Sequence, residues 1–494
     1  MTLSRSRRVR PVLLVVVLLV TALLAVVGCA VNPATGRREL SLLSPEQEAE
    51  IGREGYGAVV AEYGVYDDPA LAAYVDSVGR RVARASDLPG LSWRFTVLDD
   101  PAVNAFAMPG GYIYVTRGLL AHMGSEAQLA GVLGHEIAHV TARHSARQLT
   151  QQTLAGLGLR IATVISPEFE PYSGLAAQGL GLLMLKYSRD DETEADRLGV
   201  RYSAVAGYDA REVPGTYRTL QRIAERGGQS LPSWLSTHPD PGDRAERTTR
   251  LAAEAMAQRK DARVGERPHL ERLRGLVYGE DPRYGWFEGD GTFVHPVLRF
   301  RMRFPSDWRT EHTHTAVTAE ASGGAGLMQL TLARESTGRS PSEQVVAMSS
   351  AGRIASSQGA AERLGEWPAW IGRVSVPDGQ GGQSPMVAGW VRVSSAAMLQ
   401  VMGRGQSPGD AAERQVEAGI RSIAPLTDAA ALAVRPNRIR VVPASREGSF
   451  RSVWTGMGDG LLPAEEGAVL NGLQVEDRVA KGRLLKVVDR PRLP

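Results

Sequence analysis

The stretch "GVLGHEIAHVTARH", residues 131–144, decides how the fold and function of this chain are interpreted. Its central "HEIAH" places His135 and His139 four residues apart. On a helix, positions i and i+4 share one face, so both imidazoles can reach one metal ion while Glu136 stands beside them. The flanking residues are uncharged and small or apolar, which is typical of a buried active-site helix.

This pattern predicts a zinc site that hydrolyses peptide bonds. Catalytic zinc takes three protein ligands and leaves one position to a water molecule, whose pKa the metal lowers to about 7. Glu136 is the expected general base, which takes a proton from the attacking water and passes it to the leaving amine. The alternative is a solvated helix face, and the apolar flanks disfavour it.

A third ligand is expected in "SRDDETEADRLG", residues 188–199. Glu192 and Asp196 are also four residues apart on a helix, so one carboxylate can bind zinc while the other accepts the free N–H of a histidine ring. Glu194 points elsewhere. Without the two histidines, the same cluster would indicate only a charged helix N-terminus stabilised by the helix dipole.

The combination of "HEIAH" and "SRDDETEAD" resembles metallopeptidase family 48, the gluzincins that include HtpX-like and BepA-like envelope proteases and the CAAX prenyl proteases. The stretches "VNPATGRRELSLLS", "NAFAMPGGYIYVTRGLL", "AGYDAREVPGTYRTL" and "STHPDPGDR" agree with that family. The resemblance implies one zinc ion per chain, held by His135, His139 and Glu192. It also implies that Glu136 is the general base and that Asp196 is a supporting carboxylate.

The resemblance also implies a zinc latch at His238, in "STHP". In BepA-like relatives the matching histidine occupies the open zinc position and silences the enzyme until it is displaced. A structural or exposed loop histidine is the alternative.

In the same family, "NAFAMPGG" resembles the edge strand above the active-site helix. An extended substrate can add to such an edge through main-chain hydrogen bonds. Asn104, Ala105 and Ala107 are therefore candidates for substrate contact, and simple packing is the alternative.

Three further polar residues near these motifs are expected to take no direct part in metal binding or catalysis. Arg189 and Arg244 are expected in exposed ion pairs. His144 follows His139 by five positions, so on a continuous helix it rotates away from the metal.

The N-terminus reads as an export signal, with basic "MTLSRSRRVR" followed by an apolar run that ends at Cys29. Residues 26–29 resemble the lipobox of bacterial lipoproteins, in which this cysteine is acylated. A transmembrane anchor or an ordinary signal is the alternative, because the run can just span a bilayer. Either case places the protein outside the cytoplasm. Ala30 favours the outer membrane, facing the periplasm, in a cell with two membranes.

A length of 494 residues suggests about three domains. We predict a multidomain α+β protein whose α-rich gluzincin domain contains a small sheet and precedes a β-rich α+β domain. We predict a signal at residues 1–28, a protease domain at 29–255 and a helical tail with linker at 256–285. A β-rich domain of unknown role follows at 286–426, and a small last unit at 436–490.

Two further features concern packing. The apolar stretch between the zinc motifs, residues 152–188, is either a mobile lid or a membrane-facing or partner-facing loop, or a set of core helices that pack under the site. The tryptophans of the β-rich domain are expected to pack in its core and at its edges, and these are Trp286, Trp308, Trp367, Trp370 and Trp390.

The last unit, which runs from "RIRVV" to "KGRLLKVV", resembles a degenerate LysM fold in which two helices lie between an opening and a closing strand. LysM domains bind glycans such as peptidoglycan. Here "EGSF" replaces the usual "GDT", so a structural or protein-binding role is the alternative to peptidoglycan contact.

The charge pattern excludes nucleic acid as a partner, because the formal net charge is +3 and no dense basic block follows the N-terminus. We therefore expect a lipid-anchored zinc metalloendopeptidase of unfolded or misassembled envelope proteins. The alternative is an envelope assembly or chaperone-like factor with a latched or weakly active site. The intact Glu136 favours the enzyme, because binding alone needs no general base.

Overall fold

The computed structural model describes residues 29–152, 187–226, 234, 238, 241–334, 336–377, 382–458 and 461–489. The predicted export signal and most of the apolar stretch between the zinc motifs lie outside these residues. Within them, no helix has the length and apolarity needed to cross a membrane.

The residue contacts divide the chain into two compact units. A helical unit consists of Met1–Val60, Val65–Leu276 and Ile439–Val488. A β-rich unit consists of Ala61–Gly64, Val277–Arg438 and Asp489–Pro494. The protein therefore has the predicted mixed α and β architecture, with a helical N-terminal part and a β-rich part after it. The finer domain boundaries stay predictions.

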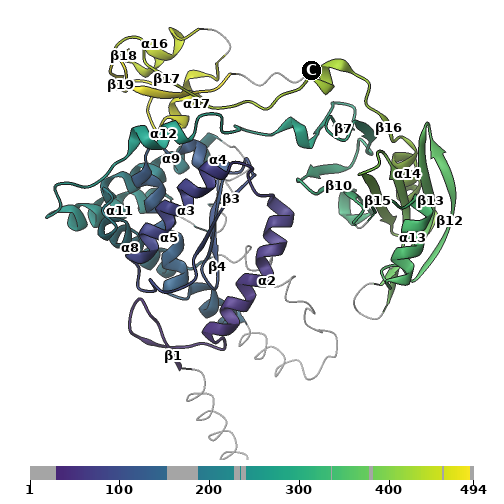
Figure 1. Ribbon diagram of the computed structural model, residues 1–494, viewed down its shortest axis with the longest axis horizontal. Coiled ribbons are helices and arrows are strands. Elements are labelled where there is room, and N and C mark those ends of the chain that lie inside the picture. Colours follow the sequence, from purple (N-terminus) through teal and green to yellow (C-terminus); the bar gives the residue numbers. More distant parts are fainter. Residues whose placement is uncertain are drawn as a thin grey trace, which may run out of the picture. The chain divides into compact units, whose positions relative to one another are not determined.

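The helical unit is built on a three-stranded sheet of order β3-β5-β4. Strand β5 (Tyr112–Thr116) runs parallel to β3 (Arg94–Leu98) and antiparallel to β4 (Ala105–Met108), which makes β4 an edge strand. Figure 1 shows α2 (Pro45–Tyr63) on one side of this sheet and α3 (Pro69–Arg84) on the other. At this edge β4 contacts α5 (Glu126–Thr141), the helix that carries "HEIAH".

The other elements of this part of the unit are β1 (Cys29–Val31), β2 (Arg38–Leu40), α4 (Arg117–His122), α5 (Glu126–Thr141), α8 (Arg189–Val205), η1 (Ala210–Glu212), α9 (Val213–Arg226), α11 (Pro241–Met256) and α12 (Glu266–Arg272). Side-chain caps fix where the two motif helices begin. Ser125 accepts a hydrogen bond from the backbone of Gln128, and Ser188 forms a capping box with Asp191.

Helices α5 and α8 approach closely because glycines meet where they cross. A Cβ on Gly134 would lie 2.9 Å from the carbonyl oxygen of Gly199, and a Cβ on Gly199 would lie 2.8 Å from the amide nitrogen of His135. Any larger residue would push the helices apart. This contact brings the acidic motif of α8 beside the histidines of α5.

The last part of the helical unit has the predicted order of a strand, two helices and a closing strand. Strand β17 (Arg440–Pro443) pairs antiparallel with β20 (Leu484–Val487), and α16 (Phe450–Thr455) and α17 (Ala464–Leu470) lie between them in sequence. The short strands β18 (Gly448–Ser449) and β19 (Arg478–Val479) form a second pair. We call Ile439–Val488 the C-terminal module.

The C-terminal module is anchored by Lys486, which is buried. Its Nζ donates hydrogen bonds of 2.7 Å to the carbonyl oxygens of Ala121 and Met123, at the end of α4. Arg222 of α9 also donates to the carbonyl oxygen of Leu473. The module is therefore fixed directly before the helix that carries "HEIAH".

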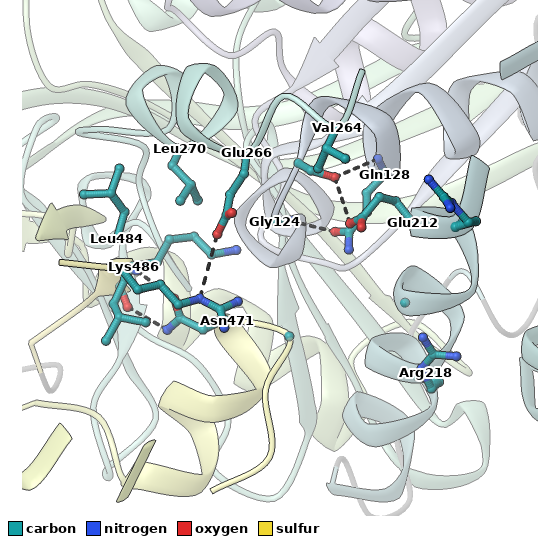
Figure 2. A pocket seen from close by; sticks show the side chains of 16 residues that line it. Gly124, Gln128, Glu212, Arg218, Val264, Glu266, Leu270, Asn471, Leu484 and Lys486 are labelled. Carbon is teal, nitrogen blue, oxygen red and sulfur yellow. Dashed lines mark hydrogen bonds and ion pairs between the residues drawn. The ribbon is translucent and has the colours of Figure 1, made fainter. Parts of the chain in front are cut away.

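A cavity of about 270 Å³ lies at this junction, and Figure 2 shows the side chains that line it. Its walls come from the start of α5, from η1 and α9, from the segment around α12, and from the C-terminal module. Gln128, Glu212, Arg218, Asn471 and Lys486 are among its lining residues. The C-terminal module thus completes a polar cavity whose other walls come from the rest of the helical unit.

The β-rich unit contains a seven-stranded antiparallel sheet of order β12-β13-β14-β15-β11-β10-β9 and a four-stranded sheet of order β16-β8-β7-β6. Helices α13 and α14 pack against the larger sheet. The elements are η2 (Pro282–Tyr284), β6 (Trp286–Phe287), β7 (Thr292–His295), β8 (Phe300–Arg303), β9 (Arg309–His312), β10 (Ala316–Glu320), η3 (Ser322–Gly324), β11 (Gly326–Leu332), α13 (Pro341–Ser350), β12 (Ser356–Leu364), β13 (Trp367–Pro377), β14 (Gln383–Arg392), β15 (Met398–Gly405), α14 (Ala411–Arg421), β16 (Ala424–Pro425) and α15 (Ala429–Leu432).

The tryptophans of the β-rich unit pack as predicted. Trp286, Trp308, Trp370 and Trp390 are buried, and Trp367 packs against the core from a partly buried position. Trp370 and Trp390 also meet edge to face, with ring centroids 5.5 Å apart. These rings therefore stabilise the core and form no exposed platform.

Candidate metal centre

Four buried side chains converge between α5 and α8. Each of His135, His139, Glu192 and His238 offers one ligand atom, and these atoms all lie within 4.8 Å of one another. The Nε2 atoms of the two α5 histidines are 3.0 Å apart, and each lies 3.5 Å from an oxygen of Glu192. The structure therefore brings the three predicted ligands together, with the predicted latch histidine among them.

The donor set fits zinc. Tetrahedral zinc with bonds of about 2.0–2.1 Å requires ligand atoms about 3.3 Å apart, and zinc is most often bound by imidazole and carboxylate groups at catalytic sites. His238 completes this spacing, because its Nδ1 lies 3.4 Å from His135 Nε2 and 2.8 Å from an oxygen of Glu192. The cluster can thus hold one tetrahedral ion with either His238 or an outside molecule as the fourth ligand.

Glu136 is buried at the edge of this cluster. Neither of its oxygens has a hydrogen-bond partner among the residues that the structure describes, and the closest ring nitrogen of His238 lies 3.8 Å away. Burial raises the pKa of Glu136 to about 7, although the nearby His238 opposes the shift. A buried carboxylate without a partner is costly for folding, so its position indicates a chemical role.

Asp196 supports His135 from behind. One of its oxygens lies 3.1 Å from His135 Nδ1, the nitrogen that faces away from the cluster. The same carboxylate receives Arg244 and Arg247, each at 2.6 Å. This arrangement agrees with the prediction that one carboxylate of "ETEAD" holds a histidine ring.

The prediction of an exposed ion pair for Arg244 is wrong, because this side chain is 0% exposed. Its guanidinium lies 2.6 Å from an oxygen of Glu192 and 2.6 Å from Asp196, and it stacks over the rings of Tyr217 and Trp234. Spacing in the sequence does not show that α11 crosses α8, so the motif "DPGDR" alone could not place this cation. Arg189, by contrast, is exposed as expected.

The charges around Glu192 keep it ionised. Burial alone would raise its pKa, but the neighbouring His238 and Arg244 outweigh burial and lower the pKa to about 2. An ionised carboxylate is the form that binds a divalent cation. Glu194, two positions later, lies outside the cluster, as predicted.

His139 has partners that the sequence does not reveal. Its ring stacks on Tyr187 with centroids 3.9 Å apart, and its Nδ1 shares a hydrogen bond of 2.8 Å with Nδ1 of His144. His144 is outside the metal cluster, as predicted, but it contacts a candidate ligand directly. The chain turns sharply after α5, and only the structure shows this turn.

The predicted substrate residues lie at the edge strand β4. Ala105 and Ala107 are in β4, and Asn104 directly precedes it. Both alanines are buried, whereas Asn104 is half-buried and its side-chain oxygen has no hydrogen-bond partner in the described part of the chain. Strand β4 contacts α5, so the edge runs next to the candidate metal centre.

Comparison with known proteins agrees with this geometry. Residues 69–252 match the model of peptidase family M48. The chain is 38% identical over 164 residues to the mitochondrial metalloendopeptidase OMA1 of Arabidopsis thaliana and 30% identical over 231 residues to that of Schizosaccharomyces pombe. It is also 30% identical over 223 residues to the beta-barrel assembly-enhancing protease of Escherichia coli.

These similarities cover part of each protein. The aligned residues make up 33% of this chain for the Arabidopsis thaliana protein, 46% for the Schizosaccharomyces pombe protein and 43% for the Escherichia coli protein. They span 68% of the Schizosaccharomyces pombe protein, but only 32% of the Arabidopsis thaliana protein and 45% of the Escherichia coli protein. The chain thus spans less than half of the last two relatives.

Proposed function

Because the chain belongs to peptidase family M48, we propose that it is a zinc metalloendopeptidase in which Glu136 is the general base. The observation that carries this proposal is the position of Glu136. It is fully buried beside a cluster of two histidines and a glutamate, and neither of its oxygens has a hydrogen-bond partner among the described residues. A role in binding alone would not require such a group.

In this proposal His135, His139 and Glu192 hold the metal, and Asp196 orients His135 through its Nδ1. Zinc, when bound, would polarise the scissile carbonyl and lower the pKa of water to about 7. The remaining chemistry comes from the chain. Glu136 takes a proton from the attacking water and returns it to the leaving amine.

We assign a latch role to His238. Its ring is fully buried, stacks on Trp234 with centroids 4.8 Å apart, and lies within hydrogen-bond distance of Glu192. A substrate carbonyl would need the space that this ring fills. Displacement of His238 would therefore precede cleavage.

The closed site also favours a second function. A protein whose metal centre is covered by its own histidine can act mainly by binding, as an envelope assembly or chaperone-like factor. The two functions differ in one measurable property, which is cleavage that depends on Glu136.

The proposed substrates are unfolded or misassembled proteins of the cell envelope. An extended chain could add to the free edge of β4 next to α5, with Asn104, Ala105 and Ala107 along its path. The similarity to a protein named beta-barrel assembly-enhancing protease supports an envelope location. We further propose that Cys29 carries a lipid anchor that holds the protein at the membrane, outside the cytoplasm. We also propose that the C-terminal module contacts peptidoglycan.

Cleavage of casein tests the enzymatic function. The full-length chain is purified in detergent, loaded with zinc, and compared with the His238→Ala variant and with the double variant His238→Ala/Glu136→Gln. We expect faster cleavage by the His238→Ala variant than by the wild type and none by the double variant. An inactive His238→Ala variant that still holds one zinc ion per chain would favour the assembly factor.

Two substitutions test the metal ligand and the anchor. Glu192→Ala should strip most zinc from the purified protein, and full zinc retention would refute its role as a ligand. Cys29→Ser should abolish labelling by a radioactive fatty acid in cells, and labelling that persists would contradict the lipid anchor.

A further inference from the structure

The two candidate zinc histidines of α5 are supported in different ways. His135 reaches a carboxylate directly, through the 3.1 Å contact between its Nδ1 and Asp196. Among the residues that the structure describes, no carboxylate contacts His139 Nδ1, and this nitrogen instead shares the 2.8 Å hydrogen bond with Nδ1 of His144. Both rings of this pair are buried, so water does not compete for the bond.

The second nitrogen of His144 points to an acid. His144 Nε2 lies 3.3 Å from an oxygen of Glu194 and 3.7 Å from Asp191. Of these two acids only Glu194 is within hydrogen-bond distance of His144, and the same Glu194 oxygen also lies 3.5 Å from Arg147. The side chains therefore form a chain of contacts from His139 through His144 to Glu194.

This chain of contacts fixes the tautomers. An ionised carboxylate only accepts hydrogen bonds, so the Nε2 of His144 must carry the hydrogen that points to Glu194. The tautomer of His144 that carries this hydrogen on Nε2 has a lone pair on Nδ1, which can accept the hydrogen of His139 Nδ1. His139 is left with its lone pair on Nε2, which is the nitrogen that faces His135 and Glu192 in the cluster.

A break in the helix makes the contact possible. On a continuous helix, a residue five positions after His139 would be rotated by about 140° from it. The helix α5 instead ends at Thr141, and Arg143 has a left-handed backbone with φ of 55°. This reversal returns the His144 ring to the same side as His139.

The N-terminal segment holds this break in place. Asn32 donates a hydrogen bond of 3.0 Å to the carbonyl oxygen of Ala142. Arg143 donates to the carbonyl oxygen of Leu43 at 2.8 Å and pairs with Glu48. A left-handed conformation is unfavourable for arginine, so these contacts offset the cost of the turn.

We propose that His144 is a positioning residue for the zinc ligand His139, and that it couples this ligand to the carboxylate of Glu194. The proposal rests on the proposed function, because it requires that His139 binds zinc. It assigns to a second histidine the task that Asp196 performs for His135. His144 itself contacts neither metal nor substrate.

Zinc affinity tests this role. The dissociation constant for zinc is measured by competition with a chelating dye on the full-length protein in detergent. His144→Leu removes both hydrogen bonds while filling the space, and His144→Asn keeps an oxygen that can accept from His139 but does not reach Glu194. We expect zinc binding to weaken about 10- to 100-fold in the Leu variant, as is typical for loss of a group that supports a ligand, and less in the Asn variant.

His269→Asn is the matched control. His269 is also a fully buried histidine, it is hydrogen-bonded to Tyr74 at 2.9 Å, and it lies outside the metal cluster. Its substitution should leave zinc affinity unchanged. The absorption spectrum of the cobalt-loaded protein is a second readout, and it should change for His144→Leu but not for His269→Asn.

Three results would overturn the inference. The first is a folded His144→Leu variant that binds zinc as tightly as the wild type and has the same cobalt spectrum. The second is an equal loss of zinc in His269→Asn, which would trace the effect to general stability. The third is a wild type that binds no zinc, and only this result would also defeat the proposed function.

Discussion

A buried charged side chain lies near each end of α5, and the two differ in whether an opposite charge lies nearby. At the metal centre, Arg244 is surrounded by two acids, Glu192 and Asp196. At the other end, Lys486 meets the carbonyl oxygens of Ala121 and Met123, and the desolvation of its amine is not offset by a nearby acid. A buried charge with an opposite partner stays ionised, whereas burial lowers the pKa of Lys486 to about 7.

The neighbours of Lys486 add to this contrast. His269 is buried near the amine, and His122 is half-buried there. Desolvation lowers the pKa of His122 to about 4 and that of His269 to about 3, and the charge of Lys486 adds to each shift. These rings stay neutral and provide no negative charge. The buried charges of the metal centre are therefore compensated by opposite charges, whereas the buried amine at the junction with the C-terminal module is not.

The largest effect is expected for Arg244→Met. The substitution leaves Glu192 and Asp196 buried without their shared cation, and loss of one partner from a buried pair costs about 3–5 kcal/mol. Urea unfolding in the presence of a chelator measures this loss without a contribution from zinc. The matched control is Arg247→Met, which removes a cation from the same Asp196 but at a side chain that is 23% exposed. An equal loss in the free energy of unfolding for both variants would contradict the view that Arg244 is the cation that compensates the buried acids.

A smaller effect is expected for Lys486→Met. Methionine fills a similar space but removes the hydrogen bonds that the amine donates to two carbonyl oxygens, which costs about 1–3 kcal/mol. The free energy of unfolding by urea at neutral pH is the measurement. A variant that is more stable than the wild type would show that removing the buried amine outweighs the two lost hydrogen bonds.

The pH dependence of the same variant sharpens the comparison. The folded pKa of Lys486, about 7, lies below its ordinary value of 10.5, so between these pH values the unfolded chain binds more protons than the folded one. The free energy of unfolding of the wild type should therefore rise with pH in this window, relative to that of Lys486→Met. Unfolding curves of both proteins at pH about 7 and about 10 measure the difference. Parallel curves would mean that the amine keeps its ordinary pKa.

The smallest effect is expected for Arg483→Ala, at the cavity of the same junction. Arg483 lies 3.8 Å from Glu266, and their side chains are 37% and 51% exposed. Such surface pairs contribute about 0–1 kcal/mol, so the variant should unfold within about 0.5 kcal/mol of the wild type. A loss as large as that of Lys486→Met would show that the cavity wall, and not the buried amine, holds the C-terminal module.

The sequence predicted the metal centre to a large extent because its spacing follows helical geometry. Positions i and i+4 lie on one face of any helix, so His135 and His139 could be paired without a structure, and so could Glu192 and Asp196. The sequence likewise predicted that a β-rich part of the chain follows the α-rich part, as the structure shows. Local rules of this kind depend on neighbours in sequence and hold wherever the helix or strand forms.

Only the tertiary structure decided the contacts between distant segments. Arg244 is buried because α11 packs against α8, and the left-handed Arg143 returns His144 to His139. The amine of Lys486 lies at the end of α4, which is distant in sequence. The sequence by itself determined which chemical groups are available and how they are spaced along each element. Packing between elements decides how deeply a charged side chain is buried and whether an opposite charge lies beside it. No local sequence pattern encodes these two properties.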